Sequence, residues 1–255
     1  MNYKSTIRNL VKKYEEEYKK FMGIGDFPKY ELELFEIDLE NSDESGFGIL
    51  AQAKYNFDTG KHILRVCTSF EGIEFMKYII FHEFTHILDS EIYVEKDVSK
   101  YIYLSGYTEY HASQVELMVL LGADNINSED FSFSVNNEIE TVTRKMRVEE
   151  YVSERHQFVV DMIRREDFPA SFDTLKSTIG ILYNYYGLRS ICKMYGNDYI
   201  EHVNNSAILE IMPSDIFYAL NTFMNGHFNK GKVELSYGLF SNILMPIAKE
   251  KNFLK

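Results

Sequence analysis

The feature that most constrains this sequence is a pair of histidines four residues apart, with a glutamate directly after the first. These residues are His82, Glu83 and His86. Residues four apart lie on the same face of a helix, one turn from each other, so both imidazoles can bind one metal ion from the same side. Glu83 leaves the helix about 100° from His82, where its carboxylate can accept a proton from a metal-bound water. The spacing therefore predicts a metal-binding helix.

The residues around the two histidines predict a helix with one apolar face and one polar face. At about 100° per residue, His86 and Asp89 fall within about 40° of His82. The helix is expected to begin near Gly72, and Asp89 is expected to form an ordinary salt bridge. The opposite half of the helix collects the large apolar residues, which are Ile73, Met76, Ile80, Phe81, Phe84, Ile87, Leu88 and Ile92.

A zinc site of this kind requires a third protein ligand, which is expected downstream of the two histidines. The segment after residue 105 predicts a second helix, with Thr108 as its N-cap. Glu109, at the start of that helix, is the predicted third ligand. Glu116 lies on the same face and is the alternative, either as a ligand or as a hydrogen-bond partner of a ligand histidine. His111 points about 200° away from Glu109, so these two side chains are not expected to share one metal ion unless the helix starts late.

The segments before the motif predict a small sheet. Tyr30–Leu39 alternates like a half-buried strand, and two further strands are joined by a turn at 58–61. The strand from Ile63 to Phe70 is a candidate for the edge strand that pairs with an extended substrate. Between Glu91 and Ser105 we expect a loop that closes over the site. The other elements expected before the motif are a helix at 3–22, a loop at 41–46, and strands at 47–57 and 62–70.

Beyond residue 137 the sequence is mostly helical in pattern. The fold class predicted from these segments is α+β, with a small sheet and two ligand-bearing helices followed by a helical C-terminal half. The expected domains are residues 1–125 and 126–255, or one continuous domain over both. A short strand is expected at 131–135. The expected helices of the C-terminal half cover about 139–166, 171–195, 197–204, 213–226 and 236–251.

The composition excludes several classes of protein. The chain has 255 residues and is 45% hydrophobic, which is enough for a full core. Its 27 basic and 39 acidic residues give a net charge of -12, which would repel a phosphate backbone, so nucleic acid is not an expected direct partner. Cys67 and Cys192 lie in apolar runs and suggest a reducing compartment. Without a signal peptide or an apolar run of membrane-spanning length, the expected location is cytoplasmic.

The motif His82-Glu83-Phe84-Thr85-His86, followed by Glu109 and Ala112, resembles the pattern of the gluzincin metallopeptidases. More narrowly, residues 62–122 are similar to the ImmA/IrrE family, which are small cytoplasmic metallopeptidases common on bacterial mobile elements. In that family the third ligand is a glutamate that opens a helix and is followed by an alanine. The chain departs from the family pattern at Phe84-Thr85 and at 113–116.

The resemblance implies a zinc-dependent peptidase whose substrate is a peptide or a protein. One Zn(II) ion would be held by His82, His86 and Glu109, and Glu83 would be the general base for the attacking water. The sequence also allows a catalytically inactive zincin-fold binding protein of a bacterial mobile element, in which the metal only stabilises the fold. A third interpretation is a helical interaction protein in which the motif is accidental.

Overall fold

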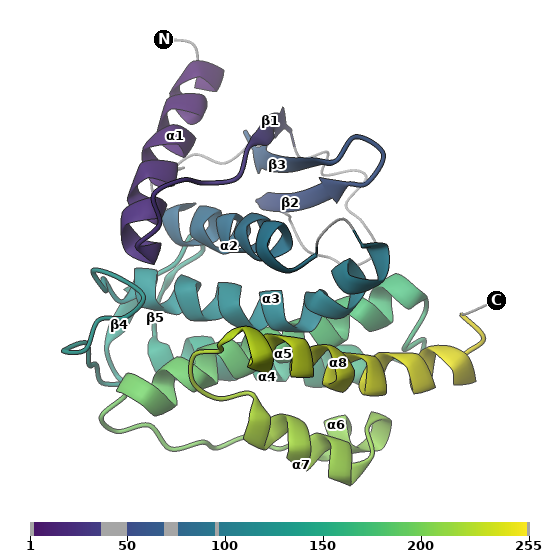
Figure 1. Cartoon of the computed structure of the whole chain (residues 1–255). Helices are drawn as coiled ribbons and strands as arrows, with labels where there is room; N and C mark the ends of the chain where they lie inside the picture. The colour runs from purple at the N-terminus through teal and green to yellow at the C-terminus, as the bar shows by residue number, and fades with distance from the viewer. Residues whose placement is uncertain (1–2, 37–49, 69–75, 95–96, 254–255) are drawn as a thin grey trace. The chain divides into compact units, whose positions relative to one another are not determined.

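The computed structural model describes residues 3–36, 50–68, 76–94 and 97–253, and it has the predicted α+β class. In the described part, a three-stranded mixed sheet lies in the N-terminal region and the remainder is mostly helical (Figure 1). The two halves expected from the sequence, 1–125 and 126–255, remain a prediction. The chain forms two compact units, Met1–Val98 with Val115–Phe131 and Glu140–Lys145, and Ser99–Gln114 with Ser132–Ile139 and Met146–Lys255.

The first unit begins with the predicted N-terminal helix, α1 (Tyr3–Met22). Its buried residues recur every three or four positions, as expected for an amphipathic helix. Gly23 follows the helix with a φ of 68°, a conformation that commonly ends helices because glycine adopts it without strain. The buried residues of α1 are Ile7, Val11, Tyr14, Tyr18 and Phe21.

The sheet of the first unit contains β1 (Tyr30–Phe35), β2 (Ala51–Asn56) and β3 (Lys61–Cys67), in the order β1-β3-β2. β3 pairs in parallel with β1 and antiparallel with β2. The hairpin predicted between the second and third strands is confirmed. The expected strand at 30–39 ends at Phe35, and the expected loop at 41–46 lies outside the described residues.

The prediction that Ile63–Phe70 forms the edge strand is wrong. Its described part is β3, which has a partner on each side and is therefore the central strand. His62, Leu64 and Val66 are buried and alternate with the less buried Ile63 and Arg65, so one face of β3 is covered. Among the described strands, β1 and β2 are the two edges of this sheet, and β2 is the one that contacts Glu83 of the motif. Its sequence, AQAKYN, is more polar than that of β3, which suits an edge.

The motif lies on α2 (Lys77–Tyr93), the second helix of the first unit. Five of the residues predicted to face the core are buried within its bounds, namely Ile80, Phe81, Phe84, Ile87 and Leu88. The prediction fails for Ile92, which lies near the end of the helix and is 51% exposed. The predicted start near Gly72 falls outside the described residues.

Aromatic side chains hold the apolar face of α2 against α1 and β1. Tyr18 of α1 makes edge contact with Phe81, and Phe27 makes edge contact with Phe84. Tyr30 at the start of β1 also contacts Phe84, with ring centroids 5.8 Å apart. Such contacts add to the stabilisation from apolar burial, so the back of the motif helix is anchored firmly in the core of this unit.

The helix predicted to bear the third ligand, α3 (Val98–Leu120), begins earlier than predicted. The loop expected at 91–105 is therefore wrong for most of its length, because α2 continues to Tyr93 and α3 covers 98–105. Thr108 lies inside the helix instead of capping it. The difference arises from the packing of Gly106, a residue that locally indicates a helix boundary. A Cβ there would lie 2.8 Å from the ring of Tyr183. The glycine serves close packing and does not mark a helix start. The predicted end holds, since Gly122 has a φ of 76° just beyond Leu120.

The rest of the described chain is helical apart from a small two-stranded sheet, which occupies the start of the helix expected at 139–166. Two predictions are wrong: 197–204 is not helical, and 131–135 contributes only an isolated bridge between Phe133 and Gly196. The helix expected at 171–195 is confirmed. The elements are β4 (Glu138–Glu140), β5 (Lys145–Arg147), α4 (Val148–Ile163), α5 (Phe172–Tyr195), α6 (Ser206–Ile211), α7 (Ser214–Phe223) and α8 (Lys230–Glu250).

Neither cysteine forms a disulfide, since Cys67 and Cys192 are both free and buried. Within the described residues, no helix combines the length and the apolar character that crossing a membrane requires.

Candidate metal centre

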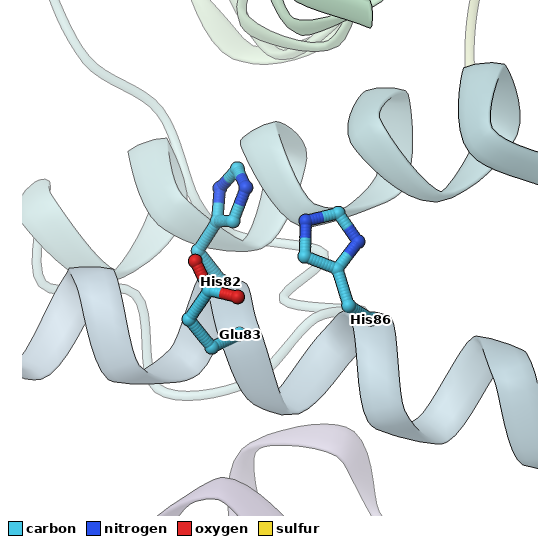
Figure 2. Close-up of side chains that lie close together, drawn as sticks. All are labelled: His82, Glu83 and His86. Atoms are coloured by element: carbon cyan, nitrogen blue, oxygen red, sulfur yellow. The ribbon is translucent and has the colours of Figure 1, made fainter. Parts of the chain in front are cut away.

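His82, Glu83 and His86 come together on α2 as a group that can hold a metal ion. One nitrogen of each histidine and one carboxylate oxygen of Glu83 all lie within 4.8 Å of one another. Figure 2 shows the two imidazoles on the same side of the helix, with the Glu83 carboxylate beside them. The ring centroids are 4.8 Å apart, as the one-turn spacing predicts. This is the single such cluster among the residues that the structure describes.

A buried carboxylate orients the first histidine. The Nδ1 atom of His82 lies 2.7 Å from Oε2 of Glu116, and Glu116 is only 5% exposed. An ionised carboxylate only accepts hydrogen bonds, so Nδ1 carries the proton and Nε2 is left with the lone pair. Metal-binding histidines in proteins typically have this arrangement, because the second nitrogen's bond fixes both the tautomer and the ring orientation.

The carboxylate of Glu83 is held by a strand of the sheet. Its Oε2 atom accepts a hydrogen bond of 2.6 Å from the backbone N–H of Ala53, in the edge strand β2. The hydrogen bond connects the motif helix to a strand 30 residues earlier in the chain. No residue type signals this contact in the sequence, because the donor is a backbone group; only the order of the strands and their register reveal it.

On the buried side of the motif helix, the hydroxyl of Thr85 takes part in two hydrogen bonds. Thr85, which is fully buried, donates a hydrogen bond of 2.8 Å to the carbonyl oxygen of Phe81, one turn earlier. The hydroxyl of Tyr18 on α1 donates in turn to Oγ1 of Thr85, at 3.0 Å. Burial raises the pKa of Tyr18 well above its usual value, so the phenol stays a neutral donor. This chain of bonds fixes α2 relative to α1.

The other predicted site residues lie on α3 and at the end of the motif. Glu116 makes the histidine hydrogen bond that one of the alternatives predicted for it. Glu109 belongs to the second unit, where its Cγ lies 3.5 Å from the position of a Cβ on Gly180, and its role as third ligand remains a prediction. His111, in the same unit, stacks on Tyr107 with ring centroids 5.5 Å apart. Asp89 is 1% exposed, which is unusual for a carboxylate.

Comparison with protein-family models, with curated proteins and with solved structures finds no match to this chain. What is established is therefore the group of His82, Glu83 and His86 on its helix, with no family assignment. The donor set fits Zn(II), which favours imidazole nitrogen and carboxylate oxygen. The Glu116 hydrogen bond strengthens the fit, because it leaves Nε2 of His82 as the nitrogen that can bind a metal.

Proposed function

We propose that this protein is a zinc-dependent peptidase of the gluzincin type. The observation that carries the proposal is the His82, Glu83 and His86 group, in which one histidine is oriented by the buried carboxylate of Glu116. His82 and His86 would hold the metal together with Glu109 as the third protein ligand. A zinc ion in such a site lowers the pKa of a water molecule and polarises the carbonyl group that is attacked.

In the proposed reaction, Glu83 moves the proton. One of its oxygens, Oε2, accepts the Ala53 hydrogen bond, so the proton of the attacking water goes to Oε1. Glu83 then passes this proton to the nitrogen of the departing amine, as general bases commonly do when the same group later acts as an acid. Because Glu83 directly follows His82, its side chain leaves α2 about 100° from that of His82, and its carboxylate lies beside the two imidazoles.

The proposed substrate is an extended segment of a peptide or a protein, bound along the edge of β2. The N–H of Cys67 donates to the carbonyl oxygen of Leu50, which defines the hydrogen-bonded pairs of the hairpin. By alternation, Ala51, Ala53 and Tyr55 direct their backbone groups away from β3. The N–H of Ala53 is engaged by Glu83, so an extended chain would pair with other outward backbone groups of this edge, which lies beside the motif helix through that contact.

The replacement of Glu83 by Gln tests the proposed function. The amide keeps the size of the side chain but removes the basic oxygen, so zinc occupancy and folding should match wild type. Cleavage of a peptide library, read by mass spectrometry, should fall by about three or more powers of ten. Glu91→Gln is a matched control on the same helix, because Glu91 pairs with His62 at 3.0 Å and takes no part in the group.

Cleavage by Glu83→Gln at the wild-type rate would exclude this mechanism. If zinc-loaded wild type cuts no peptide or protein, a non-catalytic binding protein that uses zinc for stability becomes the better account. If the protein does not bind zinc, the motif has no metal function.

A further inference from the structure

The distances within the metal group do not by themselves decide the role of Glu83. Its carboxylate lies as near to the two histidine nitrogens as a ligand would, within 4.8 Å, so a metal ion could draw it in as a direct ligand. A carboxylate bound to the metal would no longer be a free base. Some other contact must therefore keep Glu83 beside the metal position, and the structure contains one such contact.

That contact is the hydrogen bond from the backbone N–H of Ala53 to Oε2 of Glu83. The donor is rigidly placed, because Ala53 lies opposite Leu64 within the paired β2–β3 ladder. It is also not needed by the ladder, since Ala53 belongs to the set of residues that point away from β3. At 2.6 Å the bond is short, as is usual when the acceptor is charged.

We infer that the N–H of Ala53 positions Glu83 as the general base and restrains it from becoming a metal ligand. This inference rests on the proposed function. The flexible glutamate side chain is fixed at one oxygen by a strand, while the helix fixes its Cα. Two rigid elements thus define the position of the second oxygen, the one that would receive the proton. If the hydrogen bond only stabilised the packing of β2 on α2, it would make no difference which carboxylate oxygen of Glu83 accepts it.

Proline at position 53 tests the inference, because it removes the N–H. At an outward-facing position of an edge strand, proline costs no ladder hydrogen bond, so β2 can remain paired. Ala51→Pro is the comparison for fold and zinc occupancy: it lies in the same strand, its N–H also points away from β3, and it makes the same change of residue. A lost contact between its N–H and an extended substrate would raise KM and leave kcat unchanged. Circular dichroism and thermal unfolding of both variants show whether the sheet is retained.

The first measurement does not require activity. In metal-free protein labelled with 15N-alanine, the amide resonance of Ala53 should shift when Glu83 is replaced by Gln, because the charged acceptor is lost. The resonance of Ala51 should stay in place. An Ala53 amide that is insensitive to Glu83→Gln would show that the hydrogen bond does not form, and the inference would fail.

The second measurement separates positioning from simple stability. Ala53→Pro should lower kcat about 10- to 100-fold, the scale expected when a catalytic group is misplaced by about 1 Å, with zinc occupancy equal to that of Ala51→Pro. Glu83→Asp, whose shorter side chain draws back from β2, should lose a similar factor. The double variant should lose little more than either single one, since both changes remove the same contact.

The inference and the proposed function fail in different ways. Equal kcat for Ala53→Pro and Ala51→Pro, with Glu83→Gln inactive, would overturn the positioning role and leave the peptidase intact. If Ala53→Pro does not fold, Glu83→Asp provides the test in its place, and a wild-type kcat in that variant would overturn the positioning role. No turnover by zinc-loaded wild type would overturn both.

Discussion

The Nδ1 atom of His82 and the Oε2 atom of Glu116 are 2.7 Å apart, although the two residues are separated by 34 positions and lie on different helices. Both side chains are largely buried, at 13% and 7% exposure. A carboxylate in such a place needs a strong partner to offset its lost hydration, and the imidazole N–H provides one. The pair therefore fixes the ring of His82 before any metal binds.

Removing the charge of Glu116 should weaken zinc binding without abolishing it. In Glu116→Gln the amide oxygen can still accept from Nδ1, but the bond is weaker and the histidine is a poorer ligand. We expect a loss of about 10- to 100-fold in zinc affinity, measured by competition with a chromophoric chelator. Glu91→Gln is the control, because it alters a similar carboxylate–imidazole pair outside the group. An affinity equal to wild type would contradict the orienting role, and complete loss would make Glu116 a direct ligand.

The third ligand can be identified by comparing two variants of α3. Glu109→Ala should reduce zinc affinity severely, by about three powers of ten or more, because two histidines alone hold zinc poorly. His111→Ala should leave the affinity near wild type, because this ring points away from Glu109 and stacks on Tyr107. Isothermal titration of metal-free protein would measure both. Unchanged affinity in Glu109→Ala would mean that another residue completes the site.

The parts of the site that the sequence predicted are those set by local periodicity. Phe81, Phe84 and Ile87 are buried because helical spacing alone places them on one face of α2. The position of β3 was not predictable in this way, since its central place depends on pairing with β1, about thirty residues earlier. The role of Ala53 was equally hidden, because a backbone N–H has no residue type and is directed only by the register of the hairpin.

The start of α3 was mispredicted for a tertiary reason. Gly106 in the segment SGYT indicates a helix boundary when only local propensity is considered. In the fold this glycine lets the helix approach Tyr183, and a side chain at that position would be too close. The same reasoning explains why Thr108, a good capping residue, lies inside the helix. Glu109 consequently lies in the middle of α3 and does not open it.

Two glycines of α5 should respond in opposite directions to replacement by alanine. A Cβ on Gly180 would make ordinary contact with Glu109 at 3.5 Å, so Gly180→Ala should stabilise the helix by about 0.5–1 kcal/mol. A Cβ on Gly187 would overlap the carbonyl oxygen of Tyr110, so Gly187→Ala should destabilise the protein by about 1–3 kcal/mol. Urea unfolding of both variants tests this pair. An equal, small effect at both positions would contradict the close approach of α3 and α5.

Acid should destabilise the second unit through His156. Burial lowers the pKa of His156 below its usual 6.5, and the hydrogen bond with Asn205 and the charge of Glu201 offset this only in part. In the unfolded chain the ring takes up a proton at its ordinary pKa, while the folded protein resists protonation. Stability is therefore lost as the pH falls below about 6.5 and through the lower folded pKa.

Replacing His156 by Gln removes this titration while keeping an amide that can donate to Asn205. The urea midpoint of the variant should fall less than that of wild type between pH 7.5 and pH 5.5. Parallel pH profiles for the two proteins would show that His156 does not contribute to the acid sensitivity.

The most direct test of the account is the zinc content of the protein, purified without a metal-chelating tag and then reconstituted with zinc. Elemental analysis should find one zinc per chain in wild type. His82→Ala and His86→Ala, each of which removes one imidazole of the group, should retain almost none after the same dialysis. Well under one zinc per wild-type chain, or equal zinc in wild type and both variants, would contradict the assignment of His82 and His86 as metal ligands.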